Sequence, residues 1–453
     1  EVEISDIAFG GRGLTRLDGM AVFVDQAVPG DQAVIRIFKR KKQFAEARAI
    51  EILKPSPDRI EAPCPYSGYC GGCKWQFLEY GRQLDYKRQN VAESLAHIGG
   101  IKDVTVHPTI PSPLSFEYRN KMEFTCSTRR WLLPSELENP DIERGISVGL
   151  HVPGTFDKVL DTRACLLQPE LGNRILEDVR QFIKSSPQPV YGLRSHEGFW
   201  RFVVLRHSVY RDAWLVNLVT AFEDKDTIQR LADMLCSRYE NISGVVNNIT
   251  ARKAGVAIGE TETHVAGQSH MVDRIGNFEF VISANSFFQT NTRGAEQLYE
   301  TVERYAELTG TDSVVDLYSG TGTIPIFLSQ VAKTIAGIEI IESAVADAEK
   351  NCRRNSISNC RFVQGDIRTS LQDIDSTPDV LIVDPPRAGM HKDVVPQVID
   401  MNPARIVYVS CNPATLARDL AIMQEAYQVL EVQPVDMFPH TYHIEAVAKL
   451  VRK

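Results

Sequence analysis

Long apolar runs are missing from this sequence, and so is the pattern of a secretory signal. No stretch of the 453 residues approaches the roughly 18 consecutive apolar residues that a membrane-spanning helix needs. The first residues show no basic segment followed by an apolar core, which a signal peptide would contain. We therefore expect a cytoplasmic protein that has no membrane partner.

Cysteine is scarce, and basic residues are not in excess. Nine cysteines in a chain of this length are too few and too unevenly spaced for a disulfide scaffold. The formal net charge of −8, taken as a sum, argues against a nucleic-acid partner, although a local basic face is still compatible with it. What is present, 43% hydrophobic and 24% charged residues, is typical of a globular protein with roughly three domains.

Positive charge is nevertheless concentrated near the N-terminus. Turn signals such as Gly10-Gly11 and Pro29-Gly30-Asp31 separate short apolar runs, and this spacing predicts a compact β-barrel over residues 1–60. The charges alone favour a solvated hairpin edge that blocks aggregation, and the alternative is an RNA-binding face. The basic residues concerned are Arg36, Lys39, Arg40, Lys41, Lys42 and Arg48.

Three thiols follow the barrel within ten residues, in a loop rich in glycine and proline. They are Cys64, Cys70 and Cys73, and a metal site explains such a cluster better than three oxidisable loop thiols. Zinc ribbons prefer two Cys-x2-Cys pairs, and only one is present here. An iron–sulfur cluster needs a fourth ligand, for which Cys165 is a candidate.

Two larger bodies follow along the chain. Residues 61–282 contain a predicted helix over 76–97 and then mixed strands and helices, which indicate a central α+β domain. From about residue 310 the pattern becomes strand, glycine or acid, helix, strand. This alternation predicts a doubly wound α/β sheet within a C-terminal domain of residues 283–453.

The C-terminal domain contains a candidate cofactor pocket. A strand that includes Asp316 leads into a glycine-rich turn at Gly320, and a second strand ends at Glu339, whose carboxylate can accept hydrogen bonds from the ribose of an adenosine cofactor. Pro325 stands where a dinucleotide fingerprint has its third glycine, so S-adenosylmethionine fits better than NAD. The alternative is an ordinary glycine turn in an α/β core.

Two further acids follow predicted strands. Asp366 ends the third strand, and Asp384 ends the fourth strand and is followed by two prolines. An isolated buried charge is costly, so Asp384 needs a partner or a ligand. Acid, proline and proline at this place in an α/β sheet recur in methyltransferases that act on bases.

A thiol and a carboxylate complete a possible reaction centre. Cys411 falls at the carboxyl end of a predicted strand over 406–409, and Glu445 precedes the last predicted strand. A thiolate that adds to carbon 6 of uracil makes carbon 5 nucleophilic, and a base must later remove the carbon 5 proton. The target uracil must leave the stack of RNA bases to reach both the thiol and the carboxylate. The alternatives are a packing cysteine and a solvated strand-end carboxylate.

Several motifs resemble the RNA (uracil-C5) methyltransferases of the RumA/RlmD and TrmA group, and the segment 1–60 resembles their TRAM domain, an OB-like RNA-binding barrel. The motifs are Phe-Phe-Gln-Thr-Asn (287–291), Asp-Leu-Tyr-Ser-Gly-Thr-Gly-Thr (316–323), Ser-Cys-Asn-Pro-Ala-Thr-Leu-Ala-Arg-Asp (410–419), His-Ile-Glu (443–445) and the cysteine cluster. The fold class implied is a Rossmann-like α/β methyltransferase sheet with a TRAM β-barrel and a central iron–sulfur α+β domain.

The resemblance also implies roles for individual residues. Cys411 would be the nucleophile and Glu445 the base. The S-adenosylmethionine and uracil pocket would be lined by Gln289, Tyr318, Thr323, Glu339, Asp366 and Asp384. A [4Fe-4S] cluster would be held by Cys64, Cys70, Cys73 and Cys165. Ser319 departs from the cysteine of many relatives, and residues 127–147 match nothing in the pattern.

The implied reaction is methylation of carbon 5 of a flipped uridine in 23S rRNA by a monomer without an obligate protein partner. The TRAM-like segment and the four cysteines favour the 23S rRNA branch. The same chemistry on tRNA or on two rRNA uridines is the first alternative. A radical S-adenosylmethionine enzyme usually has Cys-x3-Cys-x2-Cys, which is absent here. A non-catalytic RNA-binding iron–sulfur protein would be expected to lack Cys411 or Glu445, and both are present.

Overall fold

The computed structural model describes residues 1–371 and 377–453. These residues form two compact units. The first unit contains residues 1–63, 74–113 and 293–453, and the second contains residues 64–73 and 114–292. The units reflect compactness rather than function, so the domain boundaries placed at residues 60 and 282 stay predictions. No helix in the described ranges has the length and apolar character that a membrane crossing requires.

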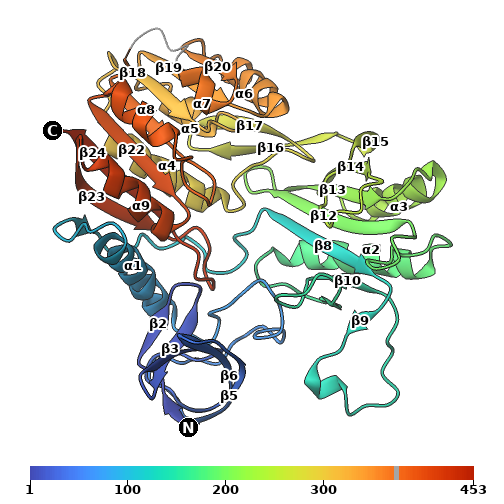
Figure 1. Cartoon of the computed structure of the whole chain (residues 1–453). Coiled ribbons are helices and arrows are strands. Elements are labelled where there is room, and N and C mark those ends of the chain that lie inside the picture. Colours follow the sequence, from blue (N-terminus) through green and yellow to red (C-terminus); the bar gives the residue numbers. More distant parts are fainter. Residues whose placement is uncertain (372–376) are drawn as a thin grey trace. The chain divides into compact units, whose positions relative to one another are not determined.

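The first unit begins with a six-stranded sheet that curls into a barrel (Figure 1). Its order is β1-β5-β6-β4-β3-β2, and alternate residues such as Val22, Val24, Ala45 and Ala47 fill its core. The compact β-barrel predicted from turn spacing is therefore confirmed. The strands are β1 Val2–Glu3, β2 Asp6–Ala8, β3 Arg12–Leu17, β4 Met20–Asp25, β5 Gln32–Arg40 and β6 Phe44–Lys54.

An eight-stranded sheet forms the rest of the first unit, in the order β20-β19-β18-β21-β22-β24-β23-β7. Its strands are β7 Thr105–Val106, β18 Ser313–Leu317, β19 Thr334–Glu339, β20 Cys360–Gln364, β21 Val380–Val383, β22 Arg405–Ser410, β23 Tyr427–Val435 and β24 Glu445–Arg452. The helices are α1 Tyr80–His97, α4 Thr292–Ala306, α5 Thr323–Leu328, α6 Glu342–Arg354, α7 Ile367–Ser370, α8 Val394–Met401 and α9 Pro413–Met423.

The centre of this sheet is parallel and buried on both faces. All four residues of β21 are fully buried, as expected for a strand that has helices on both sides. One face packs against α1, α8 and α9, whose apolar residues share a core with alternate residues of β18, β21 and β22. The α/β sheet predicted from the strand–helix alternation, and the Rossmann-like class that the resemblance implies, are confirmed.

The sheet is not parallel throughout. β24 pairs antiparallel with β22 and with β23, which gives a C-terminal hairpin at the edge of the parallel strands. The reason is that residues 436–444 connect β23 to β24 without a helix, and parallel neighbours would need a long crossover. As a result, the start of β24 lies beside the end of β22.

The helix predicted over residues 76–97 begins later than expected, at Tyr80. The Glu79 carboxylate accepts a hydrogen bond from the Arg82 amide (2.9 Å) and caps the first turn. This helix, α1, belongs to the first unit, where it packs on α9.

The second unit is built on a mixed six-stranded sheet with the order β10-β8-β12-β13-β14-β15, and α2 and α3 share its core. Two small sheets accompany it, β9 with β11 and β16 with β17 (Figure 1). The elements are β8 Lys121–Ser127, β9 Arg130–Trp131, a 3-10 turn Pro134–Glu136, β10 Ser147–Gly149, β11 Val159–Leu160, α2 Glu170–Ser185, β12 Trp200–Ser208, β13 Ala213–Thr220, α3 Lys225–Arg238, β14 Ile242–Ile249, β15 Thr261–Gly267, β16 His270–Ile275 and β17 Phe278–Ser283.

Candidate active site

The carboxyl ends of the parallel strands place several predicted site residues along one edge of the sheet. Asp384 directly follows β21, Cys411 directly follows β22, and Glu339 is the last residue of β19. Ligands bind at this edge in open α/β sheets because the loops that follow the strands leave a crevice there. These three predicted residues are thus brought to the carboxyl ends of parallel strands in one sheet.

Cys411 occupies a short turn between β22 and α9. Asn412 caps the helix by accepting a hydrogen bond from the Ala414 amide (3.1 Å), and Pro413 provides a first helical residue that needs no amide hydrogen. The Asn412 side-chain amide and the Thr415 hydroxyl both donate to the carbonyl oxygen of Arg387, at 3.0 and 3.3 Å. These bonds tie the cysteine turn to the turn that follows Asp384.

Glu445 reaches the same place from the antiparallel hairpin. Ser410 pairs with Ala446, so the residue after β22 and the first residue of β24 lie next to each other. The loop before Glu445 is fixed by α1, where the fully buried Lys87 makes an ion pair with Asp436 (2.6 Å). Glu445 was predicted to precede the last strand, and it is the first residue of that strand.

Three titratable groups, Cys411, Glu445 and Asp384, have raised pKa values in this corner. Burial, together with the nearby Glu445 and Asp384, raises the pKa of Cys411 to about 11, although the Arg387 guanidinium acts in the opposite direction. Burial and the charge of Asp384 raise the pKa of Glu445 well above its usual range. Burial raises the pKa of Asp384 to about 7. A proton is thus easily kept among these groups, and positive charge near them would favour their ionised forms.

The cofactor side of the edge is a tight glycine turn. Tyr318, Gly320 and Gly322 all have positive φ angles, and a side chain at Gly320 would be strained while projecting into open space. The Glu339 carboxylate accepts hydrogen bonds from the Gly320 amide (3.0 Å) and the Ile341 amide (2.8 Å). The turn and the second strand end are therefore held together by the acid that was predicted to face a ribose.

A cavity of about 240 Å3 opens beside this acid. Asp366, which caps α7, lies on its wall, and both carboxylate oxygens of Asp366 contact the Arg368 side chain, which lowers the pKa of Asp366 to about 2. Thr323 begins α5 and its hydroxyl lies 2.9 Å from the Tyr299 hydroxyl. The cavity is lined by Tyr318, Glu339, Ile340, Asp366, Ile367, Arg368, His391 and Val394.

Two buried polar atoms at this edge have no hydrogen-bond partner among the described residues. They are Oδ1 of Asp316, in β18, and Oγ of Ser319, in the glycine turn. Burial and the charges of Asp384 and Glu339 raise the pKa of Asp316 well above its usual range. Buried polar groups are normally satisfied, so these two atoms indicate a polar ligand that completes the site.

Asp316 and Arg387 were not among the predicted site residues. Asp316 lies inside the quoted glycine-turn motif, and its strand pattern looked like core. Arg387 follows two prolines, and a single exposed arginine gives no signal until the turn is seen to be bonded to the cysteine turn.

The comparisons with known proteins agree with this geometry. A family model described as tRNA (Uracil-5-)-methyltransferase matches residues 214–453, and a TRAM domain model matches residues 1–50. The chain is 44% identical to an uncharacterized RNA methyltransferase of Chlorobaculum tepidum, over 95% of this chain and 91% of that protein. The chain belongs to the tRNA (uracil-5-)-methyltransferase family. It is an RNA (uracil-C5) methyltransferase, and the resemblance seen in its motifs is confirmed.

Other relatives of this methyltransferase cover its full length. An uncharacterized RNA methyltransferase of Bacteroides thetaiotaomicron is 38% identical over 97% of this chain and 98% of its own. A solved structure, the Pyrococcus abyssi tRNA (uracil-54, C5)-methyltransferase in complex with S-adenosyl-L-homocysteine, aligns with a TM-score of 0.78 at 29% identity. That alignment covers 99% of this chain and 100% of the other.

The remaining predicted site residue of the methyltransferase, Gln289, lies in the second unit. It is half-buried, and its backbone carbonyl accepts a hydrogen bond from the Asn120 side chain (2.7 Å). Its role toward cofactor or uracil stays a prediction.

The four cysteines predicted to hold a cluster also lie in the second unit. Cys165 is buried, and the three loop cysteines are half-buried. Burial, together with the nearby Cys165 and Cys64, raises the pKa of Cys70 to about 11. In the described residues no group of three or more His, Cys, Asp or Glu side chains is arranged to hold a metal ion. The predicted [4Fe-4S] ligand set stays a prediction.

Proposed function

We propose that this methyltransferase transfers a methyl group from S-adenosylmethionine to carbon 5 of a uridine in 23S rRNA. The observation that carries the proposal is the pairing of β22 with β24, which sets Cys411 beside Glu445, next to Asp384 and on the same sheet edge as the glycine turn. A nucleophile, a base and a cofactor turn in one crevice are what this reaction requires.

The proposed steps use the residues of this corner. The Cys411 thiolate adds to carbon 6 of the flipped uracil, and the electron pair of the 5,6 double bond moves to give an enolate. The enolate electron pair then forms the bond from carbon 5 to the methyl group, while the methyl–sulfur bond breaks and leaves its electron pair on the sulfur of the departing S-adenosylhomocysteine. The Glu445 carboxylate removes the proton from carbon 5, the enolate re-forms, and its collapse restores the double bond and expels the thiolate. The raised pKa of Glu445 makes its carboxylate a stronger base than an exposed one.

The residues on the cofactor side fit S-adenosylmethionine. When bound, it supplies an electrophilic methyl group on a positively charged sulfur. Glu339 would hold the ribose, and the unpartnered Oδ1 of Asp316 would accept a hydrogen bond from the amino acid part. Asp384 and its prolines would orient the uracil, and the roles of Gln289, Tyr318, Thr323 and Asp366 follow from the family motif.

The RNA substrate has one serious alternative. The four cysteines and the TRAM domain favour 23S rRNA, and we propose that the protein acts on it as a monomer in the cytoplasm. The tRNA enzyme of Pyrococcus abyssi, however, aligns over its whole length with this chain, so the overall architecture does not discriminate between the two RNAs. A tRNA uridine is therefore the second candidate.

The substrate is tested by offering unmodified 23S rRNA and tRNA transcripts separately, with labelled S-adenosylmethionine. We expect label in 5-methyluridine at one position of 23S rRNA and none in tRNA. Label in tRNA alone would replace the substrate and keep the reaction. Label at two rRNA positions would widen the substrate, and label in a nucleoside other than 5-methyluridine would contradict the proposed chemistry.

We also propose that Cys64, Cys70, Cys73 and Cys165 hold a [4Fe-4S] cluster. Four thiols suit the chemistry of such a cluster, and three of them lie on one short loop that can close around it. The mutual electrostatic effect of Cys70, Cys64 and Cys165 supports their proximity. The cluster would order this loop in the second unit.

Iron analysis tests the cluster. Protein purified without oxygen is expected to contain about four iron and four sulfide ions per chain, with visible absorption. Cys70→Ser should lose most of this iron, because one ligand is missing. The matched control is Cys236→Ser, at an exposed cysteine outside the set, which should keep it. Stoichiometric zinc, or full iron in the Cys70 variant, would contradict the proposal.

A further inference from the structure

The second unit contains a cavity of about 710 Å3 that none of the predicted site residues lines. Three stretches of the chain contribute to its wall: residues between the end of β8 and Arg144, the two residues before β11, and a loop around residue 194. It is nearly three times the volume of the cavity beside Glu339. We refer to it as the Trp131 cavity, after the aromatic residue on its wall.

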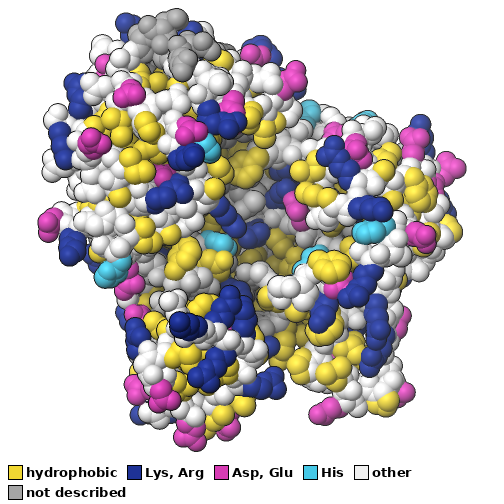
Figure 2. All heavy atoms as spheres, in the orientation of Figure 1, with side chains coloured by type: hydrophobic (Ala, Val, Ile, Leu, Met, Phe, Trp, Pro, Cys, Tyr) yellow, Lys and Arg dark blue, Asp and Glu magenta, His cyan; other side chains and the backbone are white. Residues whose placement is uncertain are grey.

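Positive charge dominates the wall of the Trp131 cavity. One carboxylate, Asp157, stands against five cations, although the whole chain has a net charge of −8. Asp157 makes an ion pair with Arg194 (2.5 Å), so an excess of cations is left over. In Figure 2, Lys and Arg side chains gather over the part of the second unit where Figure 1 labels β9. The cations are Arg129, Arg130, Arg144, Lys158 and Arg194.

An aromatic surface accompanies these charges. Trp131 is 41% exposed, whereas Trp75, Trp200 and Trp214 are almost fully buried. The Lys158 ammonium lies 4.2 Å from the centre of the Trp131 ring. Proteins that bind single-stranded nucleic acids combine exposed aromatic rings with cations, because the bases stack on the rings while the phosphates contact the positive charges.

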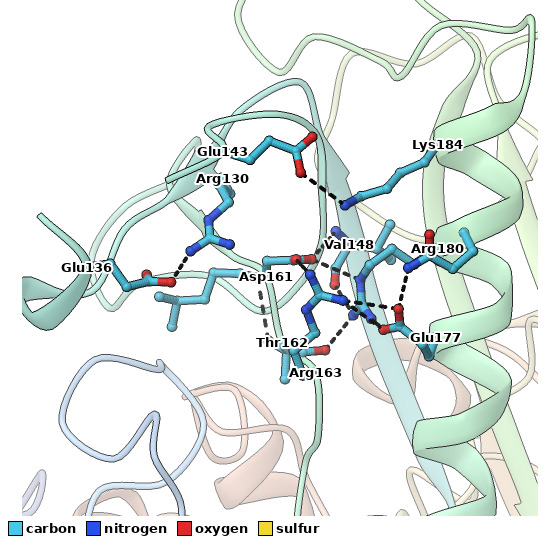
Figure 3. A network of polar contacts seen from close by, with 12 residues as sticks. Arg130, Glu136, Glu143, Val148, Asp161, Thr162, Arg163, Glu177, Arg180 and Lys184 are labelled. Carbon is cyan, nitrogen blue, oxygen red and sulfur yellow. Dashed lines mark hydrogen bonds and ion pairs between the residues drawn. The ribbon is translucent and has the colours of Figure 1, made fainter. Parts of the chain in front are cut away.

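The wall that presents Trp131 is fixed before any ligand arrives. β9 pairs with the buried β11. Arg130 pairs with Glu136, and Lys184 lies 3.9 Å from Glu143 (Figure 3). In the same network the buried Arg180 makes an ion pair with Asp161 (2.9 Å) and donates to the Val148 carbonyl (2.9 Å). A ligand would therefore meet an ordered surface, which lowers the entropy lost on binding.

We propose that the Trp131 cavity binds a single-stranded segment of the substrate RNA away from the target uridine. A base stacks on Trp131, and the phosphates beside it contact Arg129 and Arg144, which are both exposed. The inference rests on the proposed function, because it takes RNA to be the substrate. It assigns a binding role to residues 127–147, which no family motif covered.

Binding of a fluorescein-labelled oligouridylate of about 12 nucleotides, followed by anisotropy, tests the inference. Trp131→Ala should weaken binding about 5- to 150-fold, and Trp131→Phe should retain most of the affinity because a ring remains. Arg129→Ala with Arg144→Ala should reduce the slope of log affinity against log salt by about 1.4. The matched control is Lys225→Ala, an exposed lysine of the same unit outside the cavity, which should leave both quantities unchanged.

Intrinsic fluorescence gives an independent reading, since Trp131 is the one exposed tryptophan of the four. Oligouridylate should quench the emission of the unmodified protein and protect it from acrylamide. Uridine monophosphate at the same concentration should do neither. If the monophosphate protects as well as the oligonucleotide, the cavity is a nucleotide site and the RNA inference fails.

Methylation kinetics separate this inference from the proposed function. On whichever RNA the unmodified protein methylates, Trp131→Ala should raise KM about 5- to 150-fold and leave kcat unchanged. Unchanged KM and unchanged oligouridylate affinity in a variant with normal thermal unfolding would overturn the role of the cavity and leave the proposed function intact. Absence of methylation by the unmodified protein, with Trp131-dependent RNA binding preserved, would overturn the proposed function alone.

Discussion

Replacing Cys411 by alanine is expected to reduce methylation of RNA on the order of 10⁴-fold or more, the scale of loss seen when an enzymatic nucleophile is removed. Without a thiolate on carbon 6, carbon 5 of uracil has too little nucleophilic character to take a methyl group. The measurement is a single-turnover assay with labelled S-adenosylmethionine. RNA affinity should change little, because the thiol contributes to the reaction more than to binding.

The control for Cys411→Ala is Cys236→Ala, which removes an exposed thiol from α3 and should methylate at the normal rate. Methylation by Cys411→Ala within about tenfold of normal would contradict covalent catalysis.

The pH profile of the unmodified protein provides a second check on the thiol. With its pKa raised to about 11 by burial and by the nearby Glu445 and Asp384, Cys411 is mostly protonated at neutral pH in the free protein. Because the thiolate is the reactive form, the single-turnover rate should rise with pH. A rate that falls between pH 7 and 9 would contradict this assignment.

Replacing Glu445 by glutamine is expected to stop the reaction after methyl transfer. Glutamine keeps the shape of the side chain but cannot accept the carbon 5 proton, so the methylated RNA should stay bonded to Cys411. Turnover should fall about 10²- to 10⁴-fold, the usual contribution of a general base. A protein–RNA adduct should be visible on a denaturing gel and should carry label from S-adenosylmethionine.

Two controls support the interpretation of this adduct. Glu425→Gln, at an exposed carboxylate of the same unit, should turn over normally without accumulating adduct. Adding Cys411→Ala to Glu445→Gln should abolish the adduct. Normal turnover by Glu445→Gln would assign the base to another residue, and Asp384, with its raised pKa, is the nearest candidate.

Local sequence patterns predicted the parts of the structure that local forces determine. The fourth predicted strand, which leads to Asp384, is observed as Val380–Val383, because an apolar run ends at an acid and two prolines. Cys411, Asp384 and Glu339 could be placed at one edge because the carboxyl ends of parallel strands coincide. The position of Glu445 beside Cys411 needed the register of β24, which its own residues do not specify.

Long-range partners explain what the sequence did not predict. Lys87 in α1 is fully buried because Asp436, 349 positions away, neutralises it, and no local pattern of the helix indicates that partner. The Trp131 cavity is lined by residues as far apart in the sequence as Ser127 and Ser195, so no local pattern predicts it. The cysteine ligands were inferred from resemblance, and their spacing alone left zinc and iron–sulfur open.

The antiparallel pairing of β22 and β24 sets the distance between Cys411 and Glu445, and the hydrophobic core determines the register of that pairing. Side chains alternate between faces along a strand, so a slip of one residue would turn Glu445 to the opposite face and also remove Leu450 and its neighbours from the core that they share with α1, α8 and α9. The packing of the core therefore fixes the position of the catalytic base. A chain that folds with this core intact has Glu445 beside Cys411. Inherited defects of the reaction should then map to apolar residues of β24 as often as to the reacting groups themselves.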